Sequence, residues 1–283
     1  MTNSNYLVLS KIFSSAFMDK LANETSEELA IYFEELLLKY PIGKRKKVKT
    51  VIDLVYSDFE ENYRNEHYYK NKLFTDVILQ KHDLNNSLSL TEFNVGTSKA
   101  DLCVFNGTST VYEIKSEKDS PKRLFQQVED YKKLFEYVYL VTYPDFVKKI
   151  KDQLPDYLGI IVLDNNLFHE ERNATSNIKF FEHKYFFDSL RMNEFKSIVN
   201  KEFGYVPDVP NTQIYKECWK LFEKIEITDV HNLYISEVRK RELSIEQKKL
   251  IKKLPKSIKI STISKRYNVK QCYNIIDSLN MFC

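Results

Sequence analysis

The chain has 283 residues, of which 43% are hydrophobic and 14% aromatic, a composition that excludes an intrinsically disordered protein. This length suits one large domain or two modest ones with ample core. The 43 basic and 40 acidic residues leave a net charge of +3, so the overall charge does not indicate binding to nucleic acid. Any surface that binds phosphates must therefore be local.

The four cysteines are widely separated and lack the short spacings of zinc sites, which predicts reduced thiols in a cytoplasmic protein. The sequence has no basic-then-apolar leader and no uninterrupted apolar run of membrane-spanning length, so we expect no membrane partner.

Residues 1–55 have a helical, apolar pattern, and we expect them to pack on the core as an N-terminal segment. The next apolar stripe predicts one helix over residues 57–81. At 100° per residue, Glu66 falls in the middle of this stripe, whereas Glu60 falls near its edge and Glu61 outside it.

Two apolar runs, at residues 100–105 and 109–115, are typical of strands joined by a glycine turn. Side chains alternate along a strand, so Glu113 and Lys115 share one face. A three-residue loop places Asp101 opposite Glu113, whereas a two-residue loop would send it to the other face. With the three-residue loop, two carboxylates and one ammonium group converge.

Such a group can bind Mg²⁺ or Mn²⁺, which prefer hard oxygen ligands and retain waters. The lysine can then orient the nucleophile or neutralise developing charge. The alternative is an ordinary solvated strand face. The run Val111 to Lys115 is too apolar for a strand facing water, and a buried ion pair without a purpose is costly.

The following pattern predicts a helix over residues 121–136, beginning with proline, and two buried strands at 137–143 and 158–163.

Asp101, eleven further residues, and then Glu113-Ile114-Lys115 resemble the core motif of the PD-(D/E)XK nuclease superfamily. Gln127 and Tyr131 are similar to the Gln-x-x-x-Tyr helix motif of RecB-like nucleases, so the chain resembles a poorly characterised, mainly bacterial branch. The resemblance covers about residues 60–165. Asp101 does not follow a proline, a departure that the family tolerates.

The resemblance implies an α/β fold with a restriction-endonuclease-like core (a mixed sheet in the order αβββαβ) over residues 56–205, with helical N-terminal and C-terminal additions. It implies Mg²⁺ or Mn²⁺ bound by Asp101, Glu113 and the carbonyl of Ile114. Lys115 would position or activate the attacking water.

The family also often has an acid on the first helix, for which Glu66 is our choice. A strand is also predicted over residues 89–95, before the strand that carries Asp101, and Glu92 on it is a second possibility. We expect the choice between a three-residue and a four-residue turn at Gly96 to decide which face Glu92 occupies. Gln127 would hold the Lys115 region or the DNA backbone. Tyr131 would border the site or belong to the core.

Lys122 and Arg123 lie in the first turn of the helix at 121–136, where free N–H groups also favour phosphate. They are either nucleic-acid contacts or ordinary surface cations.

Residues 206–283 are predicted to form a helical C-terminal region after a proline-containing linker at 205–211. Within it, residues 244–283 have helix-turn-helix spacing, with helices at 244–254, 261–267 and 270–281. Lys270, Gln271 and Asn274 would then face outward from the start of the last helix, toward DNA. A small bundle without a DNA role, or a docking element, stays open. The expected core residues of this segment are Ile263, Tyr267, Val269, Tyr273, Ile276 and Leu279.

The sequence therefore predicts a metal-dependent endonuclease, a hydrolase of phosphodiester bonds in nucleic acid, with DNA the expected substrate. Two alternatives remain. One is a nuclease-fold module without catalysis that binds nucleic acid or a protein partner, and the other is a helix-turn-helix regulator. Homodimerisation and a partner protein also stay open.

Overall fold

The computed structural model describes residues 3–40 and 45–283, so six residues of the expected N-terminal segment, 1–2 and 41–44, lie outside the described part. The chain forms two compact units, each assembled from separate stretches of sequence. The first unit comprises Met1–Lys81, Ser116–Lys118 and Leu243–Cys283, and the second comprises His82–Lys115 and Asp119–Glu242.

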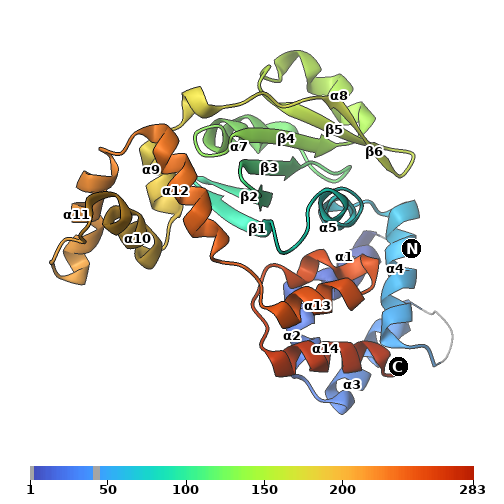
Figure 1. The fold of residues 1–283 in the computed structure, drawn as a ribbon. Coiled ribbons are helices and arrows are strands. Elements are labelled where there is room, and N and C mark those ends of the chain that lie inside the picture. The colour runs from blue at the N-terminus through green and yellow to red at the C-terminus, as the bar shows by residue number, and fades with distance from the viewer. Residues whose placement is uncertain (1–2, 41–44) are drawn as a thin grey trace. The chain divides into compact units, whose positions relative to one another are not determined.

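The second unit contains a six-stranded mixed sheet, so the predicted α/β class is confirmed (Figure 1). The strands follow one another across the sheet in chain order. The pairs β3–β4 and β4–β5 are parallel and the other three pairs are antiparallel. The strands are β1 (Leu88–Val95), β2 (Ser98–Phe105), β3 (Ser109–Ile114), β4 (Tyr137–Thr142), β5 (Gly159–Asp164) and β6 (Leu167–Arg172).

The β2–β3 hairpin has the predicted three-residue loop. Phe105 pairs with Ser109 and Leu102 with Tyr112, a register that puts Asp101 opposite Glu113. Gly107 has φ of +109°, a conformation that costs glycine little because it lacks a Cβ atom. Every residue of β3 is buried, as expected for a strand in the interior of the sheet.

Helices of the second unit pack on this sheet and on one another around one apolar core. Helix α7 contacts β2 and β3, α8 contacts β5, and α9 contacts β1. The helices are α7 (Leu124–Tyr131), α8 (Pro144–Ile150), α9 (His183–Ser189), α10 (Met192–Phe203), α11 (Asn211–Phe222) and α12 (Ile227–Arg239).

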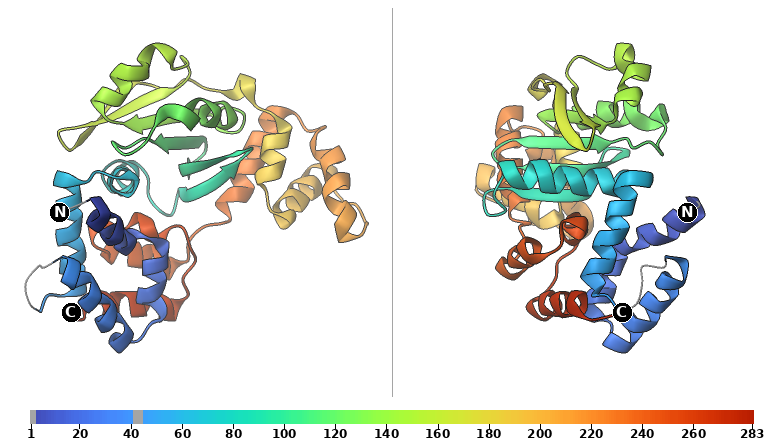
Figure 2. Two further views of the ribbon diagram at one scale, coloured as in Figure 1. Left: turned by 180° about the vertical axis from the view of Figure 1, so that it is seen from behind. Right: turned by 90° about the vertical axis from the view of Figure 1, so that its right-hand side faces the viewer.

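The first unit is helical and has a separate core, which N-terminal and C-terminal residues build together. Figure 2 shows the N-terminal helices in blue beside the C-terminal helices in red, and α14 packs on α2. The helices are α1 (Asn3–Leu9), α2 (Ser15–Asn23), α3 (Ser26–Lys39), α4 (Val48–Asn62), α5 (Glu66–Leu73), α6 (Leu79–Lys81), α13 (Ile245–Lys253) and α14 (Val269–Asn280).

The single helix predicted over residues 57–81 is wrong, because α4 ends at Asn62 and α5 begins at Glu66. The side chain of Asn65 accepts a hydrogen bond from the Tyr68 N–H at 3.1 Å, which caps a new helix. Glu66 therefore lies in the first turn of α5 and not in the middle of a long apolar stripe.

The C-terminal prediction is partly wrong. Helices α13 and α14 form, but no α-helix occupies residues 261–267. Two 3-10 turns, at Lys256–Ile258 and Ile260–Thr262, lie between α13 and α14 instead. Ile263, Tyr267 and Leu279 are buried as predicted, whereas Val269 and Tyr273 are exposed by 51% and 66%. Cys272 and Ile275 fill the core instead.

The predicted boundaries at residues 55 and 205 do not coincide with the two units. The proline-containing segment at 205–211 lies inside the second unit, between α10 and α11. The predicted helix at 121–136 is also shorter, since α7 ends at Tyr131, and β6 was not predicted. Within the described residues, no helix combines the length and apolar character needed to cross a membrane.

Candidate functional site

A buried ion pair lies at the end of β3. Nζ of Lys115 donates to Oε1 of Glu113 at 2.5 Å, and their side chains are only 9% and 1% exposed. The hydroxyl of Tyr131 donates to Oε2 of the same carboxylate at 2.8 Å. Burial, and then the charge of Glu113, raises the pKa of Tyr131 above its usual range, so the phenol keeps the proton that it donates. The two oxygens of Glu113 are therefore held from two directions.

Lys115 is fixed by three further contacts. Its ammonium donates to Oε1 of Gln127 at 3.0 Å, its backbone N–H donates to the carbonyl of Val141 at 2.9 Å, and its own carbonyl accepts from the Thr142 hydroxyl at 2.7 Å. Gln127 and Tyr131 stand one turn apart on α7 and reach Lys115 and Glu113 respectively. The structure thus brings together four of the residues that the strand and helix motifs named: Glu113, Lys115, Gln127 and Tyr131.

Asp101 projects from β2, opposite Glu113, and is half-buried. Its Oδ2 accepts a hydrogen bond from the backbone N–H of Ile114 at 2.7 Å, so the carboxylate reaches across to β3. The role of the Ile114 carbonyl as a metal ligand stays a prediction.

Glu92 lies opposite Asp101 on β1, between the pairs Thr91–Leu102 and Phe93–Ala100. The turn at Gly96 has two residues, because Val95 pairs with Ser98, so the expected three- or four-residue turn was wrong.

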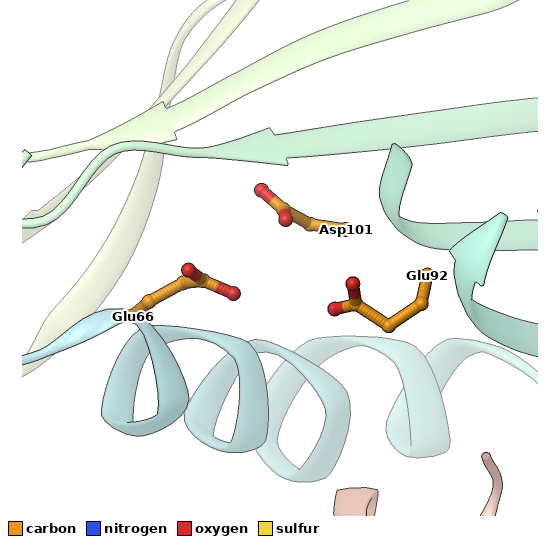
Figure 3. A group of neighbouring side chains, drawn as sticks. All are labelled: Glu66, Glu92 and Asp101. Atoms are coloured by element: carbon orange, nitrogen blue, oxygen red, sulfur yellow. The ribbon is translucent and has the colours of Figure 1, made fainter. Parts of the chain in front are cut away.

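The backbone of Glu92 has φ of +55°, a left-handed conformation that is unfavourable for a residue with a Cβ atom. Figure 3 shows Glu92 and Asp101 as neighbouring side chains, and one oxygen of each lies within 4.8 Å of the other. Spacing alone gave no sign of this backbone conformation.

These two carboxylates fit a divalent cation. Mg²⁺–oxygen bonds are about 2.0–2.1 Å long in octahedral geometry, which puts neighbouring ligand oxygens about 3 Å apart and opposite ones about 4 Å apart. The separation of Glu92 and Asp101 requires only small side-chain movements to reach such spacing. Each oxygen of Glu113 carries more than one lone pair, so its bonds to Lys115 and Tyr131 do not prevent contact with an ion.

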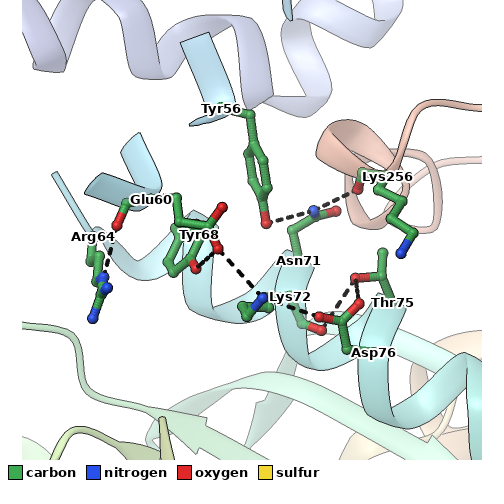
Figure 4. A network of polar contacts seen from close by, with 9 residues as sticks. All are labelled: Tyr56, Glu60, Arg64, Tyr68, Asn71, Lys72, Thr75, Asp76 and Lys256. Carbon is green, nitrogen blue, oxygen red and sulfur yellow. Dashed lines mark hydrogen bonds and ion pairs between the residues drawn. The ribbon is translucent and has the colours of Figure 1, made fainter. Parts of the chain in front are cut away.

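The helix acids belong to the first unit. Glu66, which Figure 3 also draws at the start of α5, forms an ion pair with Lys70 at 2.8 Å. Glu60 accepts from the Tyr68 hydroxyl at 2.8 Å and lies 3.5 Å from Nζ of Lys72 (Figure 4). Glu60 thus has a structural role of its own, and a catalytic role for Glu66 stays a prediction.

The predicted nucleic-acid contacts fall in different places. Lys122 and Arg123 are exposed in the 3-10 turn before α7, in the second unit. Lys270 is exposed on α14, in the first unit. Gln271 donates to Oδ1 of Asn23 at 2.9 Å and accepts from the N–H of Asn268 at 3.0 Å, so its amide is engaged within that unit.

The model of the family "Bacteriophage P4 protein cII" matches residues 59–268, which is well over half of the sequence. The chain belongs to this family. Protein cII of Enterobacteria phage P4 is 24% identical over 151 residues, which cover 50% of this chain and 54% of that protein. The chain thus matches only about half the length of this relative.

Among solved structures, the chain is similar to SPO1766, a protein of unknown function from Silicibacter pomeroyi. That match is 16% identical and covers 42% of this chain and 84% of the other, with a TM-score of 0.27.

Proposed function

We propose that the chain is a metal-dependent nuclease that hydrolyses phosphodiester bonds in nucleic acid, with DNA the expected substrate, and that its second unit is a restriction-endonuclease-like core. The observation that carries this proposal is the buried pair of Lys115 and Glu113 beside Asp101. Buried ion pairs contribute little net stability, so such a pair at the end of β3, held in place by two residues of α7, suggests another role. The chain order β1, β2, β3, α7, β4, with β3 parallel to β4, supports the proposed core.

In this proposal Asp101, Glu113 and Glu92 supply carboxylate oxygens for Mg²⁺ or Mn²⁺. A bound ion would supply Lewis acidity and lower the pKa of a coordinated water. Lys115 places a positive charge where negative charge develops on the phosphate. Gln127 holds the Lys115 ammonium and Tyr131 holds the Glu113 carboxylate, so both are positioning residues.

Lys122 and Arg123 offer two exposed cations at the start of α7 for the phosphate backbone. Cytoplasmic location, homodimerisation and a contribution of Glu66 stay predictions from the sequence.

The test is cleavage of supercoiled plasmid by the purified full chain with and without Mg²⁺. Lys115→Met keeps most of the length of the side chain without its charge, and we expect it to slow cleavage by about 10²–10³-fold, as for loss of one preorganised charge. Calorimetric Mn²⁺ affinity should persist in this variant and fall in Asp101→Asn. Lys149→Met, at an exposed position on α8, is the matched control.

The proposed chemistry would be wrong if Lys115→Met cleaved at the wild-type rate, or if cleavage by the wild-type chain were the same with and without Mg²⁺. Duplex binding without any cleavage would instead favour a nuclease-fold module that only binds nucleic acid.

A further inference from the structure

Charge is unevenly distributed along the sequence. Nine of the 43 basic residues lie between Ile245 and Lys270, with only one of the 40 acidic residues, so the rest of the chain is net negative. A net charge of +3 conceals this concentration in the C-terminal part of the first unit.

Helix α13 and the residues just after it present part of this charge on one side. Its N-terminal residue is capped by Ser244, whose hydroxyl accepts from the N–H of Gln247 at 3.2 Å. Gln247, Leu250, Ile251 and Leu254 recur at helical spacing and are buried. The opposite side carries four exposed lysines, defined here as the lysine face: Lys249, Lys252, Lys253 and, after Pro255, Lys256.

The positive charge of the lysine face is not neutralised by acidic side chains of the described residues. None of its four ammonium groups forms an ion pair within the described residues. The ammonium of the neighbouring Lys259 donates to the carbonyls of Ile251 and Lys252 at 2.7 and 3.2 Å, at the end of α13. Burial first, and then the charge of Lys256, lowers the pKa of Lys259, so the local field is positive. An anionic partner would relieve this repulsion.

We propose that the lysine face of α13 binds the phosphate backbone of double-stranded nucleic acid without reading its sequence. Lysines one turn apart offer a row of point charges, which suits phosphates and carries no base specificity. The apolar side of α13 belongs to the core of the first unit, so the helix has no face left to insert into a lipid surface. The choice of nucleic acid over another polyanion rests on the proposed nuclease function.

This surface differs from the helix-turn-helix that the sequence predicted. The amides of Gln271 and Asn274, expected to face DNA, donate instead to Asn23 and to the carbonyl of Ala22 on α2, at 2.9 and 2.8 Å. Binding is thereby assigned to α13 and not to the start of α14.

The experiment measures affinity of the full chain for a duplex of about 20 base pairs and mixed sequence, by fluorescence anisotropy in EDTA, between about 50 and 200 mM salt. The test variant replaces the four lysines of the lysine face with glutamine. The control replaces four exposed lysines elsewhere, Lys148, Lys149, Lys220 and Lys224, with the same change in net charge.

We expect the test variant to bind at least about tenfold more weakly and to lose about 3–4 from the log–log salt slope, since each phosphate contact contributes about 0.9. The control should keep the wild-type slope. If the fourfold variant fails to fold by circular dichroism, the single variants Lys252→Gln and Lys253→Gln should each lower the slope by about 0.9.

An unchanged slope in the variants, or a wild-type chain that does not bind the duplex, would overturn the inference. The inference would also be overturned if the variant lost binding to phosphatidylserine vesicles but kept its affinity for the duplex. That result would assign the lysine face to membranes. EDTA prevents metal-dependent cleavage, so a failure of the nuclease proposal alone would leave this measurement unaffected.

Discussion

At the scale of single residues, Glu92 is held in a conformation that its own backbone disfavours. A left-handed conformation costs a residue other than glycine about 1–2 kcal/mol. At Glu92 it accompanies a carboxylate that lies beside that of Asp101. Strain of this kind persists where the surrounding structure enforces it, here the flanking β1–β2 pairs.

Glu92→Gly should therefore separate stability from metal binding. Glycine relieves the backbone strain of the folded state, but it also increases the conformational entropy of the unfolded chain. The net effect should raise the free energy of unfolding by up to about 1 kcal/mol. Mn²⁺ affinity should fall, because one carboxylate is lost. Asn166→Gly, at another positive φ, is the control and should change stability without affecting Mn²⁺. A Glu92→Gly chain with wild-type affinity for Mn²⁺ would remove Glu92 from the proposed site.

His67 makes the stability of the first unit depend on pH. Its ring stacks on Phe13, with centroids 4.8 Å apart, and burial lowers its pKa to about 3. The unfolded chain takes up a proton near pH 6.5, whereas the folded chain does not. The unfolding free energy should therefore fall as pH decreases from about 6.5 toward 3.

Urea unfolding of the wild-type chain and of His67→Phe between about pH 5 and 7 checks this expectation. The variant keeps an aromatic ring against Phe13 and should show a smaller loss of stability on acidification. His231, whose pKa is also lowered by burial, titrates in both proteins and cancels in the comparison. Equal pH slopes would show that His67 takes up a proton in the folded chain as readily as in the unfolded one.

At the scale of elements, Asn71 joins α5 to the 3-10 turns that follow α13. Its amide donates to the carbonyl of Lys256 at 2.6 Å and to the Tyr56 hydroxyl at 3.1 Å, and its carbonyl accepts from the N–H of Ile260 at 3.2 Å. Figure 4 shows this side chain between Tyr56 and Lys256. The side chain thereby satisfies two backbone groups that lie nearly two hundred residues away in sequence.

Asn71→Leu should destabilise the protein by about 2–4 kcal/mol, because two buried backbone groups lose their partner and each costs about 1–3 kcal/mol. Chemical unfolding measures the effect. Asn62→Leu, which removes an exposed side-chain bond to Asp58, should change stability by less than about 0.5 kcal/mol. Similar small losses in both variants would mean that water replaces the bonds of Asn71.

At the scale of the whole molecule, the two units differ in how their residues are distributed along the sequence. The first unit needs both ends of the chain, since Leu250, Ile275 and Leu279 share a core with the N-terminal helices. The second unit is almost contiguous in sequence, because only residues 116–118 within its range belong to the first unit.

A fragment of residues 82–242 should therefore fold alone, whereas residues 1–242 should contain an unfolded first unit. The physical reason is that truncation after Glu242 removes the partners of an apolar core, as in a large cavity mutation. Cooperative thermal unfolding and dispersed amide NMR spectra of the fragment would support this expectation. A molten 82–242 fragment, or a fully cooperative 1–242 chain, would contradict it.

Local rules were enough where a structure depends on neighbours in sequence. Alternation and the loop at Gly107 predicted the β2–β3 register, and with it the approach of Asp101 to Glu113. One-turn spacing on α7 predicted that Gln127 and Tyr131 share a face, and their contacts with Lys115 and Glu113 agree.

One local feature was missed: the side chain of Asn65 caps a new helix, which outweighs apolar periodicity and displaced Glu66 from its expected position. Only the tertiary structure decided the rest. Gln271 and Asn274 found partners on α2, and the core of the first unit joined both ends of the chain. Local patterns encode which side of an element is apolar, but not which distant element will cover it, because that choice depends on the packing of the whole unit.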